Sequence, residues 1–140
     1  MDRRDVEFYD YGITRYQEGA LWVVANTEGL MSRAALDQWY AVCVDLIHQA
    51  LPGVPLRLLL DLTHKGMGVT PYLQKRVQDI LSALPEHGQA YIALVIKDSL
   101  LFRLATLMLG RAPRAPQSAS LHLFANVHEA QTWLQHPEQP

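Results

Sequence analysis

The chain lacks the features that mark several protein classes. Its single cysteine, Cys43, cannot form an internal disulfide. The formal net charge is −2, so no basic surface of the kind that attracts nucleic acid is expected. The longest strongly apolar stretch, residues 99–110, is interrupted by Arg103 and Thr106 and is far shorter than the roughly 20 residues of a membrane-spanning helix. No charged-then-apolar leader precedes Tyr9. These absences predict a cytoplasmic protein with no transmembrane segment and no nucleic-acid partner.

Cofactor signatures are also missing from the sequence. The two-glycine stretch Gly66-Met67-Gly68 lacks the glycine spacing of a dinucleotide site. The histidines are scattered without metal-ligand spacing, so neither a metal nor another cofactor is predicted. The histidines other than His64 are His48, His87, His122, His128 and His136.

The length of 140 residues suits one domain. A folded chain of this size buries roughly two-thirds of the surface of its unfolded form. We therefore expect a single domain over residues 1–140 with an ordered core at about 9–135. Residues 1–5 and 136–140 read as frayed ends.

Strand-like and helix-like segments alternate along the chain. Two β-rich runs joined through Gly19 predict a hairpin. After the hairpin, helices alternate with buried strands, which implies right-handed crossovers onto a mostly parallel sheet. We predict an α/β single-domain sandwich with a mixed, mostly parallel sheet of about five strands and about four helices. The strands are expected at residues 11–16, 20–25, 56–62, 91–96 and 121–124, and the helices at 32–51, 70–84, 100–109 and 126–134.

Helix boundaries are predicted from residues that cap helices. Ser32, Thr70 and Asn126 each stand where a helix N-cap belongs, and Pro71 occupies a first helical position that tolerates proline. Cys43 falls on the inward face of the first helix, and no nearby residue in the sequence would lower its pKa, so we interpret it as a core residue. The buried stripe predicted for that helix is Leu36, Trp39 or Tyr40, Cys43, Leu46 or Ile47, and Leu51.

The functional prediction centres on residues 58–71, a buried strand that ends in a polar loop and enters a helix. Open α/β sheets bind ligands and partners at the carboxyl ends of their strands. The next strand is also followed by a polar turn, so we expect the two loops to meet at one edge of the sheet. The candidate binding residues are Asp61, Thr63, His64, Lys65, Gly66 and Gly68 in the first loop and Lys97, Asp98 and Ser99 in the second.

The chain resembles a known family from about residue 11 to residue 134. The resemblance rests on the element order, on Asp61-Leu62-Thr63 before a Thr70-capped helix, and on Leu123-Phe124, Glu129-Ala130 and Trp133-Leu134 near the end. These features are similar to the STAS (SpoIIAA-like) domains, the family of anti-sigma-factor antagonists.

The resemblance implies a regulatory protein with a phosphorylatable hydroxyl at Thr70. A phosphate there would face the free amide groups and the positive dipole end of a helix. An ordinary N-cap also accounts for Thr70 without a phosphate.

Three functions remain open. The leading hypothesis is a noncatalytic regulatory or protein-binding module with an unknown protein partner. The second is a carrier of a small apolar or lipid-like ligand, because residues 100–109 are apolar nearly all round and Arg103 could hold an anionic head group. The same helix predicts a homodimer contact or a lipid-facing surface.

The third hypothesis is a small enzyme that uses Asp61, His64 and Lys65 as acid, base and electrophile. Their spacing fits no hydrolase or phosphate-loop motif. No catalytic residue is therefore predicted.

Overall fold

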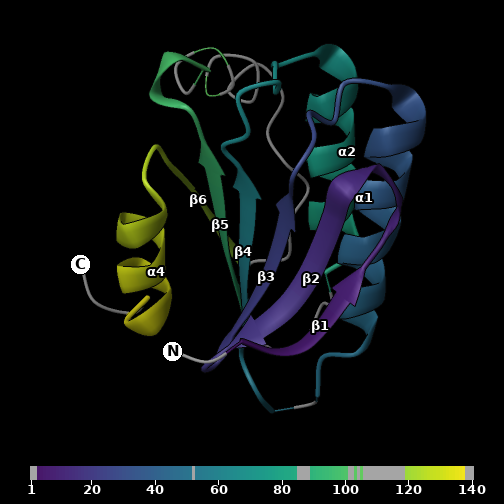
Figure 1. Cartoon of the computed structure of the whole chain (residues 1–140). Coiled ribbons are helices and arrows are strands. Elements are labelled where there is room, and N and C mark those ends of the chain that lie inside the picture. The colour runs from purple at the N-terminus through teal and green to yellow at the C-terminus, as the bar shows by residue number, and fades with distance from the viewer. Residues whose placement is uncertain are drawn as a thin grey trace.

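The protein folds around one six-stranded mixed sheet, seen in a computed structural model that describes residues 3–51, 53–84, 89–100, 103, 105 and 119–137. The strands follow one another in chain order across the sheet (Figure 1). Neighbours from β1 to β3 are antiparallel, and neighbours from β3 to β6 are parallel. The strands are β1 (Arg3–Phe8), β2 (Ile13–Glu18), β3 (Leu21–Asn26), β4 (Leu56–Leu62), β5 (Ala90–Ile96) and β6 (Ala119–Phe124).

Helices cover both faces of this sheet. Helices α1 (Arg33–His48) and α2 (Pro71–Ser82) pack on one face, and α4 (Val127–Gln135) packs on the other (Figure 1). A short 3-10 turn, η1 (Asp10–Gly12), precedes β2. The predicted α/β class with a mixed sheet is confirmed. The helix predicted at residues 100–109 lies largely outside the residues that the structure describes.

The central strands are aliphatic because both of their faces are covered. Along β4, Leu58, Leu60 and Leu62 belong to the core beneath α1 and α2, whereas Leu59 belongs to the core beneath α4. Every residue of β5 is buried. Strands covered on both faces lose the apolar-polar alternation of a half-exposed strand, which explains the continuous apolar runs in the sequence.

Side-chain caps begin the helices as predicted. The Ser32 Oγ accepts the Ala35 N–H at 3.0 Å at the start of α1, and the Asn126 Oδ1 accepts the Glu129 N–H at 3.2 Å at the start of α4. Cys43 lies in the core, where burial raises the pKa of its thiol. Its interpretation as a core residue agrees with this position.

Two expectations about the fold were wrong. Residues 3–5 are not a frayed end but part of β1, which adds a strand to the predicted five. All six β1 residues are exposed, so backbone pairing with β2 holds a segment whose sequence has no apolar alternation. Leu51 is 69% exposed instead of lying on the buried stripe, because α1 already ends at His48.

A buried guanidinium joins β1, β2 and α1. Arg15 is only 4% exposed, and its side chain donates to the Asp45 carboxylate at 2.9 Å and to the Glu7 carboxylate at 3.1 Å. The Tyr9 hydroxyl also donates to Glu7. This hydrogen bond, followed by the charge of Arg15, lowers the pKa of Glu7. Burial raises the pKa of Tyr9 to about 12. The four side chains therefore anchor the exposed β1 strand to the helical layer.

The Arg15 contact predicts an unequal response to two aspartate substitutions. Asp45→Ala leaves the buried guanidinium with Glu7 as its remaining acid partner, which we expect to cost about 1–3 kcal/mol of unfolding free energy. Asp79→Ala removes an acid that pairs with Lys75 and Arg76 on the surface of α2, and should cost no more than about 0.5 kcal/mol. Urea denaturation of both variants measures the difference.

The two aspartates form a matched pair, because each stands three residues before the end of its helix. Removing either one therefore has a similar effect on the interaction with the helix dipole. Equal losses of stability in the two variants would contradict the role assigned to Arg15.

Candidate functional site

Three loops meet at the edge of the sheet formed by the carboxyl ends of β3, β4 and β5, at the top of Figure 1. We call residues 27–32, 63–70 and 97–99 the three-loop edge, in which Asp98 and Ser99 already form the first turn of a helix. The predicted meeting of residues 63–70 and 97–99 is confirmed, because the Lys97 Nζ donates a hydrogen bond to the Lys65 carbonyl oxygen at 2.7 Å. The Leu62–Ile96 register of the two parallel strands sets up this contact.

Residues 27–32 were missing from the predicted site, although their backbone packs directly on residues 63–70. A Cβ atom added to Gly29 would lie 2.6 Å from the Gly66 carbonyl oxygen. The sequence marked residues 26–29 only as a strand break. The signal that could have found the loop is the position of β3, a further parallel strand whose carboxyl end shares this edge.

Two methionines form a reciprocal contact between the same loops. The Leu30 N–H donates to the Met67 sulfur at 3.0 Å, and the Gly68 N–H donates to the Met31 sulfur at 3.2 Å. Met67 is buried, but Met31 is 50% exposed. A thioether is a weak acceptor, so these contacts contribute mainly by packing and by satisfying two backbone donors.

The polar side chains at the end of β4 bond to their own loop. The Asp61 Oδ1 accepts the Thr63 N–H at 3.0 Å and the Thr63 hydroxyl at 2.6 Å. The His64 Nδ1 accepts the Gly66 N–H at 2.9 Å. Asp61 and His64 thereby fix local turns of the backbone.

Thr70 caps α2 as predicted. Its Oγ1 accepts the Leu73 N–H at 3.1 Å, its carbonyl accepts the Gln74 N–H at 3.1 Å, and Pro71 follows as the first helical residue. These bonds satisfy backbone donors that the first turn of a helix leaves free.

The outer surface of the three-loop edge combines charged and apolar groups. Lys65, Gly66, Asp98 and Ser99 are exposed beside the half-exposed Met31. Methionine is common at protein-binding surfaces because its long, polarizable side chain adapts to different partners.

Further apolar side chains adjoin this edge. The Thr27 N–H donates to the Gly12 carbonyl oxygen at 2.9 Å and thereby connects η1 to residues 27–32. Tyr11 in η1 is 42% exposed, and Phe8 at the end of β1 is 81% exposed. Exposed aromatic side chains beside a polar surface are typical of a protein-binding site.

Arg103 is exposed, but most of residues 101–118 lie outside the part of the chain that the structure describes. The homodimer contact and the lipid-facing surface predicted at residues 100–109 fall largely on that segment. Leu100, which is described, packs against the core beneath α1 and α2.

Two absences hold for the described ranges. No group of three or more His, Cys, Asp or Glu side chains is placed to hold a metal ion there. The helices in these ranges are also too short or too polar to cross a membrane.

Comparisons of the chain with protein-family models, with curated proteins and with solved structures yield no match. The resemblance to STAS domains stays a prediction from the sequence. Function is therefore argued from the residues themselves.

The Gly29–Gly66 approach predicts a position-specific effect of adding a methyl group. Gly29→Ala forces two backbones apart and should cost about 1–3 kcal/mol of unfolding free energy. Gly68→Ala meets only the flexible end of the Met31 side chain, at 3.2 Å, and should cost clearly less. Urea denaturation compares the two variants, and an equal cost would show that the loops are not in close backbone contact.

The cap at Thr70 predicts a graded response. Thr70→Ala should lower the unfolding free energy by about 1 kcal/mol, whereas Thr70→Ser keeps the accepting oxygen and most of the stability. Thermal and urea denaturation measure both variants. A Thr70→Ala protein as stable as the wild type would remove the assigned capping role.

Proposed function

We propose that the protein is a noncatalytic regulatory module that binds a partner protein through the three-loop edge. The observation that carries the proposal is that internal contacts hold the loops of this edge together while their outer side chains are exposed to solvent. The Lys97–Lys65 bond and the Gly29–Gly66 approach hold the loops in place, while Met31 and Asp98 remain exposed. A surface that is already ordered loses less entropy when it binds.

The same contacts give the polar side chains of this edge a structural role. Asp61 and His64 bond to Thr63 and Gly66 within their own loop. These hydrogen bonds stabilise the conformation of the loop, and an ordered loop is what the proposed binding requires.

The resemblance to anti-sigma-factor antagonists supports a regulatory use of this edge. That family carries an acidic residue before the phosphorylated hydroxyl and small residues after it, whereas Val69 and Pro71 flank Thr70. The proposal therefore requires no phosphate at Thr70. The partner is recognised by the mixture of charge and exposed apolar surface.

Site-specific photo-crosslinking tests the proposal. A photoreactive residue at position 65 or 98 should capture one common partner in cells of the source organism, and the same residue at Gln135 should not capture it. Gln135 is a matched control because it is exposed and lies at the far end of α4. Mass spectrometry of the crosslinked peptides identifies the partner and its contact surface.

Charge reversal then tests the purified pair by calorimetry. Lys65→Glu combined with Asp98→Lys should weaken binding about tenfold or more, because like charges would replace complementary ones. Gln135→Lys should leave the affinity unchanged. An unchanged affinity in the folded double variant would sink the proposal.

A further inference from the structure

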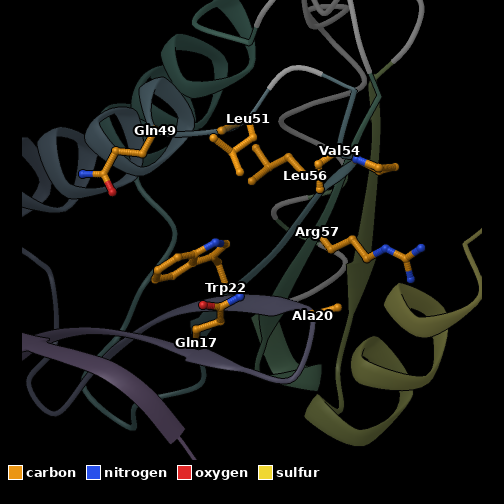
Figure 2. A pocket seen from close by; sticks show the side chains of 10 residues that line it. Gln17, Ala20, Trp22, Gln49, Leu51, Val54, Leu56 and Arg57 are labelled. Atoms are coloured by element: carbon orange, nitrogen blue, oxygen red, sulfur yellow. The ribbon is translucent and has the colours of Figure 1, made fainter.

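A concave surface lies at the end of the sheet opposite the three-loop edge. It is a pocket of about 540 Å³ between the end of α1 and the beginning of β4, with Trp22 of β3 in its wall (Figure 2). Sites for small molecules usually measure roughly 300–1,000 Å³ and combine an apolar lining with a few polar groups. The pocket has both properties.

The apolar part of the lining includes two side chains that the fold leaves in water. Leu51 is 69% exposed and Val54 is 58% exposed. In Figure 2 they gather with Leu56 on one side of the hollow, and Trp22 and Gln17 lie on the other. A flat ring between Trp22 and Leu51 would contact the indole on one side and aliphatic groups on the other. Burial of Leu51 and Val54 would favour such a complex.

The charged groups nearest the pocket are already engaged. The Arg57 Nη1 donates to the carbonyl oxygens of Leu134 and Gln135 at 2.8 and 3.0 Å, so its guanidinium points toward α4 and away from Trp22 (Figure 2). Arg15, whose guanidinium lies 5.9 Å from the centre of the Trp22 ring, is held by carboxylates on β1 and α1. Both guanidinium groups are therefore held by acceptors of the protein, and neither stands as an unpaired cation beside Trp22.

Amide side chains supply the other polar groups of the wall. Gln17 lies beside Trp22, and Gln49 stands at the end of α1 (Figure 2). The Gln49 Nε2 donates to Asp45 at 2.9 Å, which leaves its Oε1 to accept from a ligand. An amide both donates and accepts hydrogen bonds, so it pairs with uncharged polar groups.

We propose that this pocket binds a small, uncharged aromatic molecule that carries an amide or a similar hydrogen-bonding group. The ring lies between Trp22 and Leu51, and the polar group pairs with Gln17 or Gln49. The site is at the opposite end of the sheet from the three-loop edge, so its ligand and the protein partner can be tested separately.

Three probes of similar shape but different charge test the proposal at pH 7. They are neutral benzamide, the anion benzoate and the cation benzamidinium. Their binding is followed by the indole N–H signals of the three tryptophans in ¹H–¹⁵N NMR spectra. Trp22→Phe assigns the pocket signal. Benzamide should shift the Trp22 signal in a saturable way, with a dissociation constant on the order of millimolar for so small a probe. The signal of the buried Trp39 should not move, and the two charged probes should bind at least about fivefold more weakly.

Matched variants localise the binding. Leu51→Ala with Val54→Ala should weaken benzamide binding about fivefold to tenfold through lost apolar contact. Both residues are exposed, so the variant keeps the fold. Val6→Ala removes a 42%-exposed side chain on β1 and should have no effect.

Two outcomes would overturn the proposal. One is the absence of a saturable Trp22 shift in the folded wild-type protein at benzamide concentrations up to about 20 mM. The other is a charged probe that binds as tightly as benzamide, which would refute the assigned chemical class.

Discussion

The constraint on which the rest of the structure depends is the burial of β4 and β5 on both faces. Leu58 and Leu60 must be covered by one layer of helices, and Leu59 and Ala93 by another. A parallel strand reaches the next one only through a crossover, so the chain returns to the same end of the sheet after each helix. The connections that leave the carboxyl ends of the strands consequently gather at one edge. The three-loop edge is a product of this topology before any particular side chain is considered.

The loops at that edge are held together by close backbone packing and by a few hydrogen bonds. Gly29 and Gly66 have no side chains, so their backbones approach closely. Between the same two loops, the sulfur atoms of Met31 and Met67 each accept a hydrogen bond from a backbone N–H. Lys97 uses its ammonium group on the Lys65 carbonyl oxygen, within the molecule. Order at this surface therefore comes from backbone packing and internal hydrogen bonds, and Lys65 and Asp98 remain exposed.

The two ends of the sheet differ in chemistry because different parts of the chain close them. Loops that combine polar side chains with the half-exposed Met31 close the carboxyl edge. At the other end α1 stops at His48, and the following residues place Leu51 and Val54 at the mouth of a pocket beside Trp22. A helix longer by one turn would have carried Leu51 toward the core. The position of a helix end thus decides whether an apolar side chain packs in the core or lines a surface pocket.

The α/β class, the central strands and the capped starts of α1, α2 and α4 could all be predicted from the sequence. Each follows from local chemistry: continuous aliphatic runs for strands covered on both faces, and Ser32, Thr70 and Asn126 as caps. The sequence also placed residues 63–70 and 97–99 at one edge, because that follows from the order of parallel strands. The pairing of the exposed β1, the packing of Gly29 on Gly66 and the pocket at Trp22 are visible only in the folded chain. These features depend on contacts between residues distant in the chain, and such contacts leave no local periodicity in the sequence.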